Sequence, residues 1–326
     1  MQDLTFDGLT KMLGSSSVVD RPWKAKFHVP LWRYPKNLGF QKGSFLTSIC
    51  NQLKYDFDAV IVSACKRDAF ESYLSIQKKI SPKIPVIFLD GGDSSEVGGD
   101  LERESSFHLF LEAENVRPFD LIFKREVLEL KAYDPRIRPF PMCINTSIYS
   151  PVLEQARGLK KTFDVAFWAV ESSEVRSLAL ERIQDQFDCR ENGSIRGQTF
   201  RGYARKGLSY LNSLASTRIT LNFRGVGWDT LRYWECPALG TFLLSQKPRI
   251  LIEHPFINEE SIVYVSDDLS DLLDKCNYYL KNEKRRETIA RNARSHAMRF
   301  HRTFHRAATV ISAIHQHRYS VKISNF

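Results

Sequence analysis

Residues 219–246 read ITLNFRGVGWDTLRYWECPALGTFLLSQ, and this stretch decides the fold. Apolar and polar side chains alternate over 219–223, which predicts a strand that ends near Gly225. After a short glycine turn, Asp229 or Thr230 is expected to cap a helix that carries the apolar and aromatic residues of 231–239. The apolar run 241–244 then fits a second buried strand. The stretch therefore predicts a strand, a tight turn, a helix and a parallel strand, which is one βα unit of an open α/β sheet.

The same rhythm extends over the rest of the chain. Further apolar runs predict strands at 57–64, 85–89, 119–123, 163–170 and 261–265. Between them, helical patterns are expected at 68–79, 101–115, 173–182, 203–214 and 267–280. At 326 residues the chain is longer than one core usually organises, so two doubly wound domains are expected. The proline-rich segment 135–151 is predicted to join them.

The composition bears on metal sites, disulfides and cellular location. The six cysteines are scattered without a CxxC pair, which argues against a zinc knuckle or a disulfide framework. No apolar run reaches the ~20 residues of a membrane span, and the first residues lack the pattern of a signal peptide. We therefore expect reduced cysteines and a cytoplasmic location, with a peripheral position at the inner face of the membrane left open.

The net charge of +9 is concentrated in the last part of the chain. Residues 281–326 hold eleven Lys and Arg against two Glu, so residues 1–280 are balanced. Three interpretations remain open: a solvated helix face, contact with an anionic membrane or lipid-linked acceptor, and nucleic-acid binding. Because no nucleic-acid-binding motif accompanies the charge, no nucleic acid is expected as a partner.

The residues from Asp229 to Glu235, followed by CPALGTFLLSQ, resemble the C-terminal signature of the CgeB-like, group 1 glycosyltransferases. The resemblance implies the GT-B fold, in which two Rossmann-like domains face each other across a cleft, here with an abbreviated N-terminal domain. It implies a domain at 1–147 on the acceptor side, a nucleotide-sugar domain at 148–300 and a basic terminal helix at 301–326 that crosses back. It also implies a nucleotide-sugar co-substrate, no metal and no other cofactor.

The resemblance places the donor in the second domain. It assigns Glu235 to the ribose hydroxyls, although an ion pair with Arg232 or Lys206 is the structural alternative. Retaining relatives carry a second glutamate eight residues earlier, where this chain has Gly227, so the stereochemical course stays open. Anion-binding amides and cations near the strand ends complete the predicted donor site. Its candidates are Ser172, Ser173, Arg176, Arg201, Lys206, Arg224, Gly225, Gly227, Asp229, Arg232 and Glu235.

A general base for the acceptor should come from the first domain. Asp90 and Asp93 follow a predicted strand in FLDGGDSSE, and two carboxylates on a glycine turn can point toward a ligand. An Asx turn is the structural alternative for either residue. The expected function is metal-independent sugar transfer from a nucleotide-sugar to a hydroxyl of a glycan, lipid-linked or protein acceptor. The alternative is a non-catalytic homologue that binds nucleotide-sugar or glycan in envelope assembly.

Overall fold

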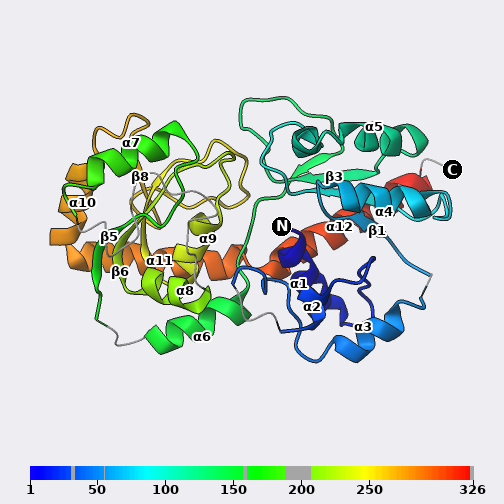
Figure 1. Ribbon diagram of the computed structural model, residues 1–326, viewed down its shortest axis with the longest axis horizontal. Coiled ribbons are helices and arrows are strands. Elements are labelled where there is room, and N and C mark those ends of the chain that lie inside the picture. The colour runs from blue at the N-terminus through cyan, green and yellow to red at the C-terminus, as the bar shows by residue number, and fades with distance from the viewer. Residues whose placement is uncertain (31–33, 55, 157–159, 188–206, 324–326) are drawn as a thin grey trace.

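The computed structural model describes residues 1–30, 34–54, 56–156, 160–187 and 207–323, with side chains up to residue 318. It has two lobes, each built on one parallel sheet (Figure 1). The first sheet is ordered β1 (Val60–Val62), β2 (Val86–Asp90), β3 (Leu121–Lys124) and β4 (Ile137–Pro139). The second is ordered β5 (Phe163–Ala166), β6 (Thr217–Asn222), β7 (Phe242–Gln246) and β8 (Val263–Val265).

Helices cover both sheets. Those of the N-terminal lobe are α1 (Gln2–Leu13), α2 (Ala25–His28), α3 (Phe45–Asn51), α4 (Arg67–Gln77), the 3₁₀ helix η1 (Gly99–Glu104), α5 (Phe107–Val116) and α12 (Thr303–Ile323). Those of the C-terminal lobe are α6 (Thr146–Ala156), α7 (Glu174–Ile183), α8 (Gly207–Ala215), α9 (Leu231–Ala238), α10 (Leu272–Lys281) and α11 (Glu283–Phe300). Among the residues described, no helix is both long and apolar enough to cross a membrane.

The sheet of the N-terminal lobe is buried on both faces, as the apolar runs predict. Along β2, Phe88 packs with side chains of α4 and α5. Its neighbours Ile87 and Leu89 point to the opposite face and pack with Val310 of α12. Because successive strand residues alternate between faces, one strand contributes to two cores.

The predicted linker 135–151 is shorter than expected. Its first part forms β4, which pairs with β3, and its last part begins α6. Pro139 ends β4, and β4 lies at the edge of the sheet, where a residue without an amide proton breaks no ladder. Because prolines are typical of linkers, the sequence pattern did not predict this edge strand.

The deciding stretch forms the predicted unit of β6, α9 and β7, and β6 and β7 pair in parallel. After α9, Gly240 has a φ of 66°, a conformation that favours glycine and ends the helix. The start of α9 differs from the prediction, because neither Asp229 nor Thr230 caps it through a side-chain hydrogen bond. The Thr230 hydroxyl instead donates to Asn222 at 2.7 Å.

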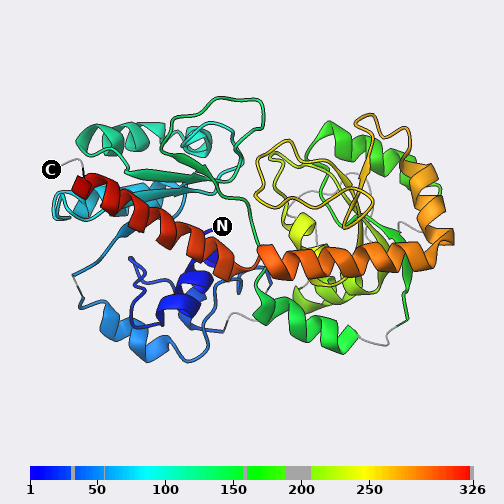
Figure 2. The same ribbon diagram turned by 180° about the vertical axis from the view of Figure 1, so that it is seen from behind.

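The end of the chain belongs to both lobes. Helix α11 packs against α9 and β7 of the C-terminal lobe, and α12 packs against α1 and the first sheet (Figure 2). A short backbone link also joins the lobes, because Leu128 and Ile250 form an antiparallel bridge. The segment that follows β3 thus lies against the segment that follows β7.

Candidate functional site

The candidate site lies at the junction of the two lobes, where strands of both sheets end. In open parallel sheets this edge carries the ligand-binding loops. The N-terminal lobe contributes the residues after β2 and β3, and the C-terminal lobe those after β5 and β6.

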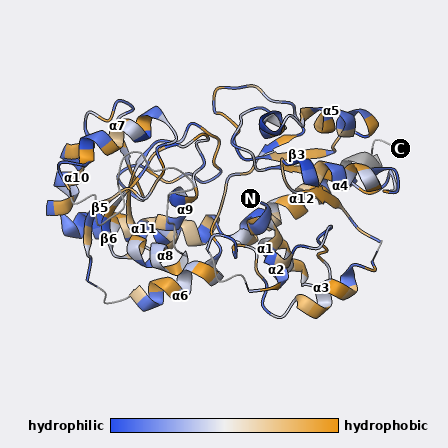
Figure 3. Ribbon diagram, in the orientation of Figure 1, coloured by the Kyte–Doolittle hydropathy of each residue, from blue (hydrophilic) through white to orange (hydrophobic). Residues whose placement is uncertain are grey.

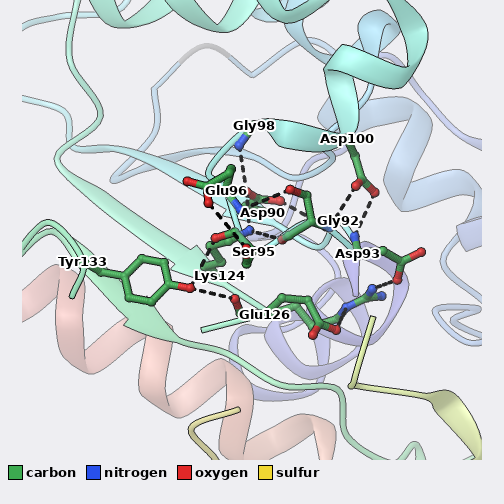
Figure 4. A network of polar contacts seen from close by, with 12 residues as sticks. Asp90, Gly92, Asp93, Ser95, Glu96, Gly98, Asp100, Lys124, Glu126 and Tyr133 are labelled. Atoms are coloured by element: carbon green, nitrogen blue, oxygen red, sulfur yellow. Dashed lines mark hydrogen bonds and ion pairs between the residues drawn. The ribbon is translucent and has the colours of Figure 1, made fainter. Parts of the chain in front are cut away.

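Both carboxylate oxygens of Asp90, at the end of β2, have partners within the protein (Figure 4). Its carboxylate accepts the amides of Gly92 and Gly98, each at 3.0 Å, and forms an ion pair with Lys124 Nζ at 3.0 Å. Lys124 is completely buried and also donates to the carbonyl of Ser94 at 2.8 Å. The contact with Gly92 is the Asx turn that was the structural alternative for this residue. Asp90 therefore shapes the glycine loop.

Asp93 lies farther along the same loop and is accessible, with 40% of its side chain exposed. It forms an ion pair with Arg125, whose own side chain is buried. Arg125 also approaches Glu126, with 3.4 Å between Nε and Oε1. The loop after β2 and the residues after β3 thus form one charged cluster.

Glu126 connects this cluster to the C-terminal lobe. Its Oε2 accepts the amide of Trp228 at 2.9 Å and its Oε1 accepts the amide of Asp229 at 3.0 Å. These amides belong to the turn that precedes α9 and lie outside the helix, so a carboxylate of the other lobe fixes this turn in place. Burial raises the pKa of Glu126, and the charge of Arg125 opposes this shift.

Gly227 explains how the lobes approach so closely. A Cβ at this position would lie 2.5 Å from Glu126 Oε1 and 3.1 Å from Asp93 Oδ1. The glycine therefore leaves room for carboxylates of the opposite lobe, which a side chain at this position would displace.

Asp229 anchors the linker. Its carboxylate accepts the amide of Met142 at 2.6 Å and the indole Nε1 of Trp234 at 2.7 Å. Burial raises the pKa of Asp229, while the Arg125 charge and these two hydrogen bonds oppose the shift. Its carboxylate therefore holds the linker between the lobes against α9.

The predicted donor residues after β5 and β6 lie together. The Ser173 hydroxyl donates to the carbonyl of Arg224 at 2.8 Å, and Arg176 donates to Ser172 at 3.0 Å. Arg176 is buried and also donates to the carbonyl of Phe223, so it holds the two loops in place. Neither serine caps α7 through a side-chain hydrogen bond.

Arg224 is the exposed cation of this group. Its guanidinium lies 5.0 Å from the ring centre of Trp228, and that of Arg249 lies 5.7 Å from the same ring. The amide of Gly225 is occupied by the carbonyl of Gly227 at 3.0 Å. The amides that bind the Glu126 carboxylate are thus those of residues 228 and 229, just after the predicted donor residues Gly225 and Gly227.

Glu235 lies in the interior, with no exposed surface. Its carboxylate accepts the Tyr34 hydroxyl and, at 2.8 Å, the Tyr210 hydroxyl. Tyr34 also shares a hydrogen bond with Tyr149 at 2.9 Å. A residue of the N-terminal segment thus reaches the helix that carries the family's glutamate, and the ribose role of Glu235 stays a prediction.

Other predicted residues divide in two groups. Arg232 is buried, donates to the carbonyl of Trp168 and lies 5.3 Å from the ring centre of Phe167. Arg201 and Lys206 lie outside the described residues. Within the described part of the chain, no three His, Cys, Asp or Glu side chains are grouped to hold a metal ion.

The sequence prediction omitted Arg125 and Glu126. The signal was present, because KRE directly follows the apolar run 119–123, and parallel strands end at the same edge of a sheet. Tyr34 and Tyr210 gave no such signal, since their meeting with Glu235 depends on the tertiary fold.

A large cavity lies elsewhere in the N-terminal lobe. It has a volume of about 670 Å³ and is bounded by α1, α12 and residues 54–63. Apolar side chains such as Phe57 and Ile61 share its wall with Arg21 and Lys54. None of the predicted catalytic or donor residues lines it.

Replacing Glu126 with alanine is expected to lower the free energy of unfolding by about 1–3 kcal/mol, because the amides of Trp228 and Asp229 lose their acceptor. Urea unfolding monitored by fluorescence measures this change. Glu129→Ala is the matched control, since Glu129 is an exposed carboxylate in the same loop. Equal stability of the two variants would show that the contact between the lobes contributes nothing.

Comparisons with known proteins agree with this geometry. Residues 173–312 match a family described as Glycosyl transferase-like. No curated protein sequence matches the chain. A sucrose-phosphate synthase from Thermosynechococcus elongatus aligns with a TM-score of 0.53 at 11% identity, covering 84% of this chain and 77% of that one.

Two ligand-bound structures are similarly related. An alpha-glucosyltransferase in complex with UDP and a 13-mer DNA aligns with a TM-score of 0.52 at 12% identity, covering 76% of each chain. Anabaena Alr3699/HepE in complex with UDP-glucose aligns with a TM-score of 0.51 at 9% identity, covering 80% of this chain and 79% of that one. The chain therefore has the GT-B fold, and its residues 173–312 match the glycosyl transferase-like family.

Proposed function

We propose that this protein transfers a sugar from a nucleotide-sugar donor to an acceptor hydroxyl at the junction of its lobes. The observation that carries the proposal is the pair of amides before α9, which already binds an anionic group, next to the exposed Arg224. A diphosphate needs partners of the same kind, namely backbone amides in the turn before a helix and a cation. The family match of residues 173–312 and the GT-B fold support this use of the site.

In this proposal the donor diphosphate replaces Glu126 at the amides of Trp228 and Asp229. Both ligands are anions and need the same two protons, so they compete for them. Arg224 neutralises the leaving diphosphate, and electrostatic stabilisation of this group supplies the main rate enhancement. Ser172, Ser173 and Arg176 keep the neighbouring loops in position.

Asp93 is the proposed general base. Asp90, the other candidate, has both carboxylate oxygens occupied inside the lobe, whereas Asp93 is partly exposed next to Gly227. A base must reach the acceptor hydroxyl before its pKa matters. Transfer without a metal, the hexosyl nature of the sugar, the class of the acceptor and the CgeB-like subgroup remain parts of the proposal.

A second candidate is a homologue that binds nucleotide-sugar without catalysis. Gly227 stands where retaining relatives carry a glutamate, and Glu235 is held between two tyrosines. Both observations reduce the number of carboxylates available to a sugar.

Thermal shift with UDP-glucose tests binding, since two related structures contain UDP or UDP-glucose. At ten times its dissociation constant, a ligand should stabilise the folded chain by about 1.4 kcal/mol. Arg224→Ala should weaken the response, and Glu126→Ala should strengthen it because a competing carboxylate is gone. If no nucleotide-sugar in a panel raises the melting temperature, both candidate functions fail.

Asp93→Asn separates the two candidates. In the enzyme it should keep the thermal shift and lose sugar transfer to an acceptor panel or to water. If the unmodified chain binds the donor but releases no nucleotide under any acceptor condition, the binding function is correct. A cytoplasmic location and contact of residues 281–326 with an anionic membrane are not needed for this mechanism and stay predictions.

A further inference from the structure

Helix α3 is oriented opposite to an ordinary surface helix. Its apolar side chains are exposed, with fractions of 74% for Leu46 and 48% for Ile49, and Leu53 just beyond it is 81% exposed. Phe45 is 44% exposed and also packs edge-on against the Trp23 ring. Successive helical residues are ~100° apart, so Phe45, Leu46 and Ile49 lie on one face, and Leu53 follows in the turn after the helix. Figure 3 shows the hydrophobic colouring of α3 at the margin of the N-terminal lobe. An apolar row of this kind marks an interaction surface.

Hydrogen bonds fix this orientation. Ser48 is buried and accepts the indole Nε1 of Trp23 at 2.9 Å. Asn51 is also buried and donates to the carbonyl of Ser15 at 2.7 Å. The polar side of α3 is therefore the side that attaches it to the lobe, and the apolar side is left for a partner.

Charge identifies the partner. Residues 21–55 contain seven Lys and Arg and no Asp or Glu. Lys42 and Lys54, both exposed, lie before and after α3, and the Lys54 ammonium also donates to the carbonyl of Ser16 at 2.5 Å. An anionic bilayer matches both properties, with its acyl boundary for the apolar row and its headgroups for the flanking cations.

We propose that α3 docks the protein on the surface of an anionic lipid membrane. The docking face consists of Phe45, Leu46, Ile49 and Leu53 with the flanking cations Lys42 and Lys54. The helix is ~10 Å long, far shorter than the hydrocarbon core, so it lies in the plane of the headgroups. The inference does not depend on sugar transfer, because none of these residues belongs to the lobe junction.

Vesicle sedimentation with the full chain tests the proposal. Vesicles of phosphatidylcholine with about 30 mol% phosphatidylglycerol should pellet the protein, and pure phosphatidylcholine should pellet far less. The double variant Leu46→Glu and Leu53→Glu should lower the apparent affinity at least ~10-fold, since both side chains enter the acyl boundary. Leu130→Glu is the matched control, because Leu130 is fully exposed in a different loop.

Charge variants separate the docking face from the basic end of the chain. Lys42→Gln should weaken vesicle binding about fivefold, the factor that corresponds to one lost cation near an anionic surface. Lys284→Glu with Arg291→Glu changes two exposed cations of α11 and should leave most of the binding. If the α11 variant abolishes binding and the α3 variant does not, the proposal is wrong.

Cys50 reports insertion directly. It is the exposed cysteine among those described, and it lies within α3. In a Cys189→Ser background, an environment-sensitive fluorophore on Cys50 should shift its emission to the blue when phosphatidylglycerol vesicles are added. Failure to bind vesicles, or self-association that hides the label without lipid, would overturn the proposal.

Discussion

Replacing Asp90 with alanine is expected to lower the free energy of unfolding by about 3–5 kcal/mol, because it leaves a buried lysine without its counter-ion. Lys124 has no exposed surface, and its Nζ lies 3.0 Å from the Asp90 carboxylate. The amides of Gly92 and Gly98 lose their acceptor in the same variant. Chemical denaturation of the full chain measures the loss.

A double variant tests whether the loss of stability comes from the unpaired charge of Lys124. Asp90→Ala combined with Lys124→Met should recover a large part of the stability, since an apolar side chain of similar length replaces the unpaired cation. Asp93→Ala is the matched control and should cost less than ~1 kcal/mol, because this carboxylate is partly exposed and its partner Arg125 keeps Glu126 as a neighbouring anion. Equal losses for Asp90→Ala and Asp93→Ala would contradict the structural role given to Asp90.

Acidification from pH 7.5 to 4.5 is expected to cost about 3 kcal/mol of stability through His301 alone. Burial, together with the charge of Arg306, lowers the pKa of His301 from 6.5 to about 2. Its Nε2 lies 2.8 Å from the carbonyl of His254 and its Nδ1 lies 3.2 Å from Arg306. The neutral ring, donating from Nε2 and accepting at Nδ1, satisfies both neighbours.

The direction of this effect follows from proton uptake. Below pH 6.5 the unfolded chain protonates this histidine, whereas the folded chain keeps it neutral down to about pH 2. The stabilisation is therefore complete above pH 6.5 and decreases as the pH falls. His301→Gln should flatten the dependence of unfolding free energy on pH, and His315→Gln, at an exposed position, should not. An unchanged slope in His301→Gln would refute the assignment.

Most of the fold could be predicted from the sequence, because the spacing of apolar residues and the positions of glycines determine strands, helices and turns locally. The stretch that forms β6, α9 and β7 is the best example, and the bounds of its elements fall within three residues of the prediction. The edge strand β4 was missed because its one proline, with others on either side, resembled a linker. An edge strand needs fewer ladder hydrogen bonds, so it tolerates prolines that a central strand excludes.

The site was predictable only in part. Positions after strands could be read from the sequence, which is how Asp93 and Arg224 were selected. What each side chain contacts could not be read, because the partners come from distant segments: Lys124 for Asp90, and Tyr34 for Glu235. The contact of Glu126 with the turn before α9 is the clearest case, since the two donors lie about a hundred residues away.

The position of α12 has a consequence for biosynthesis. This helix, near the end of the chain, covers the face of the first sheet that carries Ile87 and Leu89. The strands of that sheet are synthesised first. During translation, the C-terminal lobe has all its strands before α12 leaves the ribosome, whereas the N-terminal sheet waits with Ile87 and Leu89 uncovered. The half of the molecule that is synthesised first is thus completed last, and a nascent chain stalled before Thr303 would be a natural substrate for chaperones.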